Sequence, residues 1–99
     1  MAHRIVWSRT AAQDLRSLVK YIARDNPARA EQFGYKVISN IDILQDHPHV
    51  GRIVPEFRQS ELREIVVRPY RVIYRIKDSS EIIEIIRVWH AARNFPEIE

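Results

Sequence analysis

The strongest strand signal in the chain is the segment Tyr70-Arg71-Val72-Ile73-Tyr74-Arg75-Ile76-Lys77, in which β-branched and aromatic residues predominate. Successive side chains of a strand point to opposite faces. One face therefore carries only tyrosine, valine and isoleucine, and the other carries Arg71, Ile73, Arg75 and Lys77. We expect the first face to pack under helices and the second to present a row of three cations to solvent.

The segments on both sides extend this strand into a sheet. Leu62–Val67 and Glu81–His90 have the same β-rich composition, and each is separated from the central strand by only two or three residues. Such short connections predict hairpins, so the three strands form an antiparallel meander. A further strand is predicted over His3–Trp7, and it joins this sheet because an isolated strand cannot satisfy its backbone groups.

Two amphipathic helices are predicted between the first strand and the meander. Their apolar residues recur at helical spacing; they are Ala11, Leu15, Leu18, Val19 and Ile22 in the first helix, and Ala30, Phe33, Val37, Ile38, Ile41 and Leu44 in the second. Ser8 or Thr10 caps the first helix, and Asn26 caps the second with Pro27 at its first position. So short a turn predicts an antiparallel helical hairpin. The second helix ends near His47, because a proline follows, and residues 47–60 form a loop.

The order β-α-α-β-β-β predicts an α+β fold, with a helical hairpin packed on a small, mainly antiparallel sheet. Ninety-nine residues, 45% of them hydrophobic, suffice for a single domain spanning residues 1–99. The polar segment 94–99 is expected to fray.

The composition excludes several classes of function. The chain has no cysteine, which removes zinc fingers, iron–sulfur clusters and thiol nucleophiles and fits a reducing cytoplasm. Its two isolated glycines form no phosphate-binding loop, and its four histidines lack metal-ligand spacing, so we expect no cofactor and no metal. No apolar run approaches the ~20 residues of a membrane helix, and we expect no secretory signal. We expect a cytoplasmic protein without membrane association.

Basic residues exceed acidic ones, with 16 Lys and Arg against 13 Asp and Glu, and only three of the sixteen are lysine. Planar guanidinium groups suit bidentate recognition of phosphates and carboxylates, so this bias indicates a polyanionic partner. A codon bias towards arginine is the alternative explanation.

The cations gather near the central strand. The candidate residues for binding a target or a nucleic acid are Arg63, Arg68, Arg71, Arg75, Lys77, Arg87 and Arg93. The alternative is an ordinary wet sheet face, on which Glu64 and Glu84 neutralise several of these charges.

Three residues near this surface are candidates for catalysis. Glu56 lies in the loop that leads into the sheet, Arg71 is on the central strand, and His90 ends the last strand. Such groups can cleave a phosphodiester: a base takes the 2′-hydroxyl proton, arginine stabilises the developing charge, and an acid protonates the leaving oxygen. A structural role is the alternative for His90.

The chain resembles the RelE/ParE superfamily of type II toxin–antitoxin toxins over nearly its whole length. The resemblance rests on four motifs at family-like spacing; they are Gly51-Arg52-x-x-Pro55-Glu56, Leu62-Arg63-Glu64, Pro69-Tyr70-Arg71-Val72-Ile73-Tyr74-Arg75 and Arg87-Val88-Trp89-His90-Ala91-Ala92-Arg93. It implies a growth-inhibiting toxin that forms a hetero-oligomer with a cognate antitoxin, which lies across the helices and the sheet.

The superfamily divides by target, and the resemblance implies two alternatives. RelE-like and YoeB-like members cleave messenger RNA on the ribosome, whereas ParE-like members poison DNA gyrase and are not nucleases. Residues 48–63 contain no lysine to match RelE-like active sites, and the chain lacks the His-Tyr ending of YoeB-like enzymes. Its His90-x-x-Arg93 ending favours the ParE branch. Glu56, Arg71 and His90 are catalytic only in the nuclease alternative. A non-toxic adaptor for nucleic acid or protein is the third hypothesis.

Overall fold

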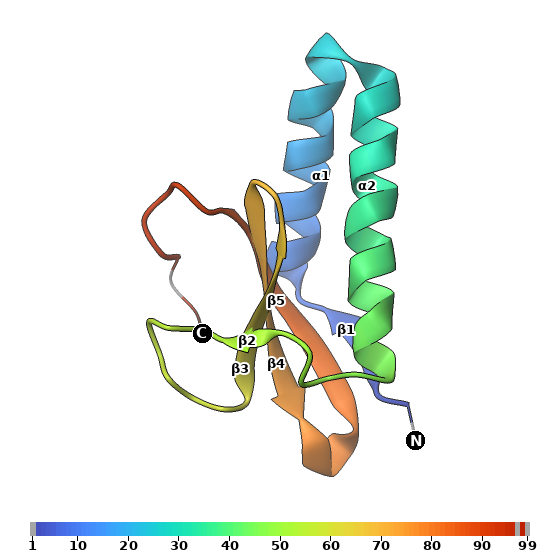
Figure 1. Cartoon of the computed structure of the whole chain (residues 1–99). Helices are drawn as coiled ribbons and strands as arrows, with labels where there is room; N and C mark the ends of the chain where they lie inside the picture. Colours follow the sequence, from blue (N-terminus) through green and yellow to red (C-terminus); the bar gives the residue numbers. More distant parts are fainter. Residues whose placement is uncertain (1, 97, 99) are drawn as a thin grey trace.

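The computed structural model describes residues 2–96 and 98. The elements in chain order are β1 (Arg4–Trp7), α1 (Arg9–Asp25), α2 (Pro27–Asp42), the short 3-10 helix η1 (Ile43–Gln45), β2 (Arg52–Ile53), β3 (Leu62–Val67), β4 (Tyr70–Lys77), the 3-10 helix η2 (Asp78–Ser80) and β5 (Ile82–His90). The helical hairpin stands against one side of the sheet, and its tip extends beyond the sheet edge (Figure 1). The α+β fold predicted from the sequence is confirmed.

The sheet has the strand order β1-β5-β4-β3-β2. Strand β1 pairs parallel to β5, and every other pairing is antiparallel. The predicted meander is therefore confirmed, as is the joining of the first strand to the sheet. Strand β2 lies within the predicted loop 47–60 and was not predicted, because a strand of two residues is too short to show an alternating pattern.

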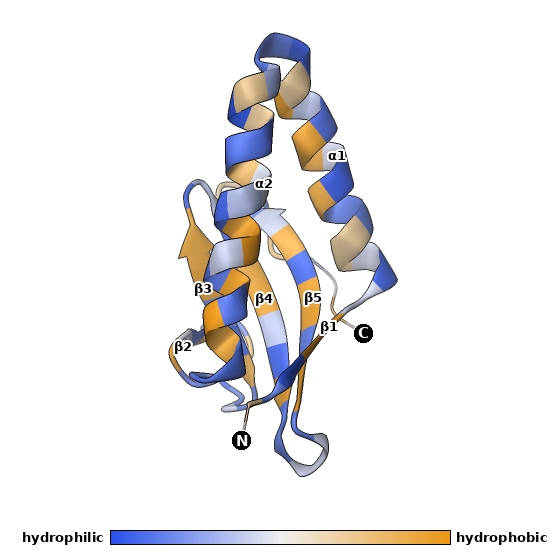
Figure 2. Cartoon of the chain, turned by 90° about the vertical axis from the view of Figure 1, so that its right-hand side faces the viewer, coloured by the Kyte–Doolittle hydropathy of each residue, from blue (hydrophilic) through white to orange (hydrophobic). Residues whose placement is uncertain are grey.

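Both helices begin where their capping residues predict. The Ser8 side chain accepts a hydrogen bond from the backbone N–H of Ala11 at 3.0 Å, and the Asn26 side chain accepts one from Arg29 at 3.1 Å. Hydrophobic and hydrophilic residues alternate along both helices, as Figure 2 shows. Ile38, expected in the apolar stripe of α2, is 39% exposed.

Two hydrophobic clusters lie on opposite sides of the sheet. The larger lies under the helices and includes Val72 and Tyr74 of β4. The smaller lies on the other side, where Val54, Leu62, Ile73 and Ile86 are buried and Phe95 and Ile98 pack against them. The side expected to face solvent is thus partly covered. Fraying of residues 94–99 stays a prediction, and Glu97 and Glu99 lie outside the described residues.

A β-bulge in β5 changes which side its last residues face. Ile73 pairs with Arg87, but the next residue, Tyr74, pairs with Ile85, so Ile86 is an extra residue. In a regular strand, period-two alternation counted from Ile85 would place His90 on the same side of the sheet as Arg71. The extra residue shifts the alternation by one, so His90 lies on the helix side, opposite Tyr70.

Candidate functional site

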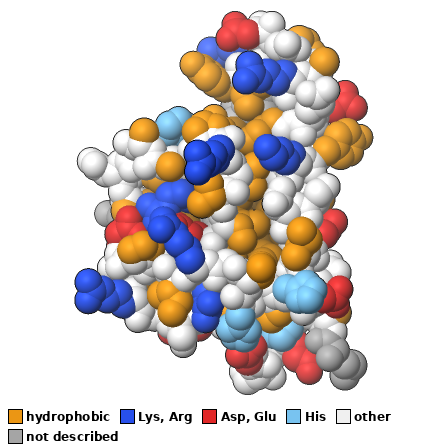
Figure 3. All heavy atoms as spheres, in the orientation of Figure 1, with side chains coloured by type: hydrophobic (Ala, Val, Ile, Leu, Met, Phe, Trp, Pro, Cys, Tyr) orange, Lys and Arg blue, Asp and Glu red, His pale blue; other side chains and the backbone are white. Residues whose placement is uncertain are grey.

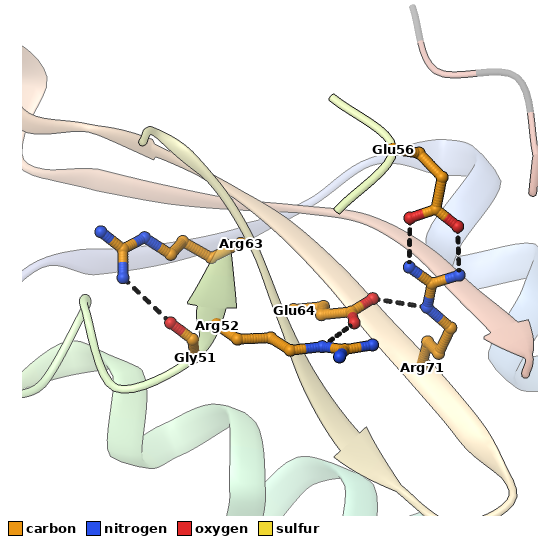
Figure 4. A network of polar contacts seen from close by, with 6 residues as sticks. All are labelled: Gly51, Arg52, Glu56, Arg63, Glu64 and Arg71. Carbon is orange, nitrogen blue, oxygen red and sulfur yellow. Dashed lines mark hydrogen bonds and ion pairs between the residues drawn. The ribbon is translucent and has the colours of Figure 1, made fainter. Parts of the chain in front are cut away.

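Arg71 is the centre of a polar network on the side of the sheet away from the helices (Figure 4). Its two terminal nitrogens donate to the carboxylate of Glu56 at 3.0 and 2.9 Å, and its Nε donates to Glu64. The Phe95 ring lies 4.9 Å from the guanidinium carbon. Arg71 is only 8% exposed, so the expectation that it faces solvent in a row of cations is wrong. Its charge is used inside the protein.

Glu64 joins this network to β2. Its carboxylate is buried and accepts hydrogen bonds from both Arg52 and Arg71. A buried carboxylate needs charged partners, because removing it from water is costly. The alternative that acidic residues neutralise this face is therefore confirmed at Glu64.

The charges of Glu56 and Arg71 stabilise one another. The hydrogen bonds from Arg71 lower the pKa of Glu56 below its ordinary value of 4.5. The two carboxylates raise the pKa of Arg71, with Glu56 the larger cause. Both groups are therefore charged at neutral pH, and Glu56 is a weak base there.

The other predicted cations of the sheet also have partners. Arg75 and Lys77 lie 3.9 and 3.5 Å from the carboxylate of Glu84. Arg87 makes two hydrogen bonds to Asp14 of α1, at 2.8 and 3.1 Å, and its guanidinium stacks on Trp89. Because these cations are paired with carboxylates, this side of the sheet attracts an anion less strongly than unpaired cations would.

Arg63, Arg68 and Arg93 each lie in a different setting. Arg63 is opposite Tyr74 in the sheet and so faces the helix side, which contradicts its expected place beside Arg71. Its guanidinium donates to the backbone carbonyls of Ser60, His49 and Gly51. Arg93 stacks on Trp89, and Arg68 is exposed in the β3–β4 turn. The predicted cations do not form one surface.

His90 is separated from Glu56 and Arg71 by the sheet. It pairs with Tyr70, which belongs to the cluster under the helices, and the two rings meet edge to face at 5.3 Å. Its Nδ1 lies 3.0 Å from the backbone nitrogen of Ala92, which donates to it. The structure therefore brings Glu56 and Arg71 together but leaves His90 on the other side.

A groove opens between the helical hairpin and the β3–β4 turn. Its volume is about 480 Å³, and its aromatic lining includes Phe33 and Tyr70. Three cations also line it, Arg29 and Lys36 from α2 and Arg68 from the turn, against one acid, Asp25. Figure 3 shows hydrophobic side chains exposed between the hairpin and the sheet, with Lys and Arg side chains beside them. The groove suits a ligand that carries both apolar and acidic groups.

The described residues provide neither a candidate metal site nor a candidate membrane span. The described residues contain no group of three His, Asp or Glu side chains that can hold a metal ion. Across the same residues, neither helix combines the length and the apolar content needed to span a bilayer.

The comparisons with known proteins identify the family. The profile described as ParE toxin of type II toxin–antitoxin system, parDE, matches residues 5–95. The chain belongs to the ParE toxin family. It is 32% identical over 90 residues to toxin RelE2 of Caulobacter vibrioides, a match that covers 90% of this chain and 96% of that one.

Solved structures of the RelE/ParE superfamily share the fold of this toxin. The chromosomal ParDE TA system from P. aeruginosa matches with a TM-score of 0.72 and 23% identity, over 90% of this chain and 96% of that one. The toxin–antitoxin complex RelBE2 from Mycobacterium tuberculosis matches with a TM-score of 0.59 and 25% identity, over 91% and 99% of the two chains. The family match and the relative at 32% identity make the protein a type II toxin of the RelE/ParE superfamily, as its motifs imply.

Sequence reasoning missed several residues that shape the toxin's surface. Arg52 and Asp14 neutralise partners far away in the chain, and no local pattern predicts such pairs. The spacing of the groove cations Arg29 and Lys36 could have been found in the sequence. They are seven residues apart, which is nearly two helical turns, so they lie on one face of α2.

Proposed function

We propose that this toxin inhibits growth by poisoning DNA gyrase and does not cleave RNA. The observation that carries the proposal is the placement of His90 on the helix side of the sheet, away from Glu56 and Arg71. A general acid and base must both lie within hydrogen-bond reach of the reacting phosphodiester. The match to the ParE profile over residues 5–95 supports the same proposal.

A supercoiling assay with purified gyrase tests this proposal. We expect the toxin to block supercoiling and to accumulate gyrase–DNA cleavage complexes, and its induction in cells to trigger a DNA-damage response. Intact supercoiling at a large molar excess of toxin overturns the proposal.

A second candidate function is ribosome-dependent cleavage of messenger RNA. It is favoured by the 32% identity to a protein named toxin RelE2. In this alternative, Glu56, Arg71 and His90 act on the phosphodiester, and the cations Arg63, Arg68, Arg75, Lys77, Arg87 and Arg93 help to bind RNA.

Primer extension on messages after induction separates the two candidates. A nuclease produces new cuts within codons, and His90→Ala lowers the cleavage rate by ~10²–10⁴-fold if His90 is the general acid. His90→Ala is a cleaner variant than Arg71→Ala, because Arg71 is buried in an ionic network and its loss also weakens the fold.

We further propose a cognate antitoxin as partner and the cytoplasm as the site of action. The RelBE2 structure is that of a toxin–antitoxin complex, which supports a hetero-oligomer here. The groove cations Arg29, Lys36 and Arg68 suit an acidic amphipathic segment of that antitoxin. Co-expression with the adjacent small open reading frame should restore growth. If expression of this protein without the antitoxin leaves growth unchanged, the protein is instead a non-toxic adaptor.

A further inference from the structure

The solvent-facing side of α1 carries four cations in a row. Arg9, Arg16, Lys20 and Arg24 are all exposed. At 100° per residue they fall within about 80° of one another around the helix axis, opposite the apolar stripe. The row extends from residue 9 to residue 24, and these 15 steps span about 22 Å at a rise of 1.5 Å per residue. We call these four residues the α1 row.

Among the residues that the structure describes, no carboxylate forms an ion pair with the α1 row. The acids of α1 point elsewhere: Asp14 binds Arg87 and the backbone of Val88, and Asp25 lines the groove on the other side of the helix. Within residues 2–96 and 98, no ion pair joins a member of the row to an acid. This distinguishes the row from the sheet cations that face a carboxylate, which are Arg52, Arg71, Arg75, Lys77 and Arg87.

The placement of Arg9 is unfavourable for the helix itself. It is the first residue of α1, whose first turn contains no acid. The helix dipole disfavours a cation at this end. The stability of the helix therefore does not explain the residue, whereas binding of an anion does.

The chemistry of the row fits a phosphate backbone better than a protein partner. Its exposed neighbours on the same face are Gln13 and Ser17, which add hydrogen-bond donors, and the half-buried Ala23 adds only a methyl group of apolar surface. Protein interfaces rely on buried aromatic or aliphatic anchors, which this face lacks and the groove possesses. Contacts to phosphate need only cations and polar donors.

We infer that the α1 row binds the phosphate backbone of duplex DNA, so that the toxin touches the DNA held by gyrase as well as the enzyme. This inference rests on the proposed function for the choice of DNA over other polyanions. Because the contacts are to phosphates, binding is independent of base sequence and weakens steeply with salt.

Fluorescence anisotropy of the purified toxin with a labelled 20-base-pair duplex tests the inference. Four phosphate contacts predict a slope of log K against log salt of about −3.6, which is roughly a hundredfold loss of affinity between 50 and 200 mM salt. We expect Lys20→Gln to reduce the magnitude of the slope by about 0.9. Lys36→Gln is the matched control, since it removes an exposed lysine of the same hairpin that lies in the groove, and it should leave the slope unchanged.

The remaining outcomes each decide the inference. Equal slopes for wild type and Lys20→Gln, or equal effects of both variants, overturn it, as does tighter binding to single-stranded RNA than to the duplex. Circular dichroism verifies that both variants are folded. Because DNA binding is measured without gyrase, a toxin that blocks supercoiling but binds no duplex refutes the DNA contact and leaves the proposed function standing. A toxin that binds the duplex through the row but spares gyrase refutes the proposed function alone.

Discussion

At the scale of single residues, the environment decides what a charged side chain can do. Arg71 and Lys20 are both cations in regular elements, yet Arg71 is enclosed by two carboxylates and an aromatic ring while Lys20 is exposed. Because its guanidinium already donates hydrogen bonds to Glu56 and Glu64, Arg71 has few donors and little unpaired charge with which to bind a phosphate. Its role in this structure is to tie the loop after β2 to β3 and β4.

Substitution of Glu64 tests this structural role. Glu64→Gln keeps the size of the side chain but removes the buried charge that faces Arg52 and Arg71. We expect the free energy of unfolding to fall by about 1–3 kcal/mol, the cost of leaving the buried guanidinium of Arg71 poorly paired. Urea denaturation measures it. Glu61→Gln, at an exposed neighbouring position, is the control and should change stability little; equal effects of the two variants contradict the role.

Acid pH probes the same network through Glu56. Its pKa is lower in the folded protein than the ordinary 4.5, so its pairing with Arg71 contributes stability that is fully present above that ordinary value. This stability is lost as the pH falls through the lowered pKa. We expect Glu56→Gln to make unfolding less dependent on pH between about pH 5 and 3 than in wild type. Thermal melts across that range measure the difference, and parallel pH profiles rule it out.

At the scale of elements, the sequence predicts what local patterns determine. Strands β3 and β4 and both helix starts follow from period-two alternation, helical spacing and capping residues. The side on which His90 lies does not follow, because it depends on the bulge at Ile86, a matter of pairing between strands. The burial of Arg71 depends on distant Glu56 in the same way. The predicted elements are therefore largely right. Of the predicted catalytic residues, only Glu56 and Arg71 lie together, and His90 lies apart from them.

Alanine substitutions at the two glycines should change the free energy of unfolding in opposite directions. In α2, a Cβ on Gly34 meets nothing nearer than Val19 Cγ2 at 3.9 Å, an ordinary contact. Gly34→Ala should therefore raise the free energy of unfolding by about 0.5–1 kcal/mol, the intrinsic advantage of alanine in a helix. Thermal denaturation measures the change, and a lower melting temperature contradicts it.

Gly51→Ala should destabilise the protein. A Cβ there lies 2.5 Å from the Tyr74 hydroxyl and 2.6 Å from the Glu64 carbonyl oxygen, so the backbone must shift. The shift disturbs the hydrogen bond that Gly51 N–H donates to Tyr74, whose hydroxyl donates in turn to Pro48. We expect a loss of about 1–3 kcal/mol, as for overpacking of a close-packed interior. An unchanged melting temperature contradicts this expectation.

At the scale of the whole molecule, the charge excess lies mainly on the helical hairpin. The sheet carries many cations, but carboxylates from β3, β5, α1 and the loop after β2 neutralise most of them. The cations of the hairpin line the groove on one side of α1 and form the row on the other. The toxin thus presents two basic surfaces, one with apolar anchors and one without, which suit different partners.

Charge complementarity at the groove should govern how fast the antitoxin binds. Electrostatic steering raises association rates and is screened by salt, whereas dissociation depends more on buried contacts. We expect the association rate constant to fall by ~10-fold or more between 50 and 300 mM salt. Arg68→Glu, which reverses an exposed charge at the groove, should slow association and weaken this salt dependence. Arg24→Glu reverses a charge on the other side of the hairpin and is the control. Stopped-flow mixing of toxin with the protein from the adjacent open reading frame measures both. If Arg24→Glu slows association as much as Arg68→Glu, long-range charge steers the antitoxin and the groove does not select it.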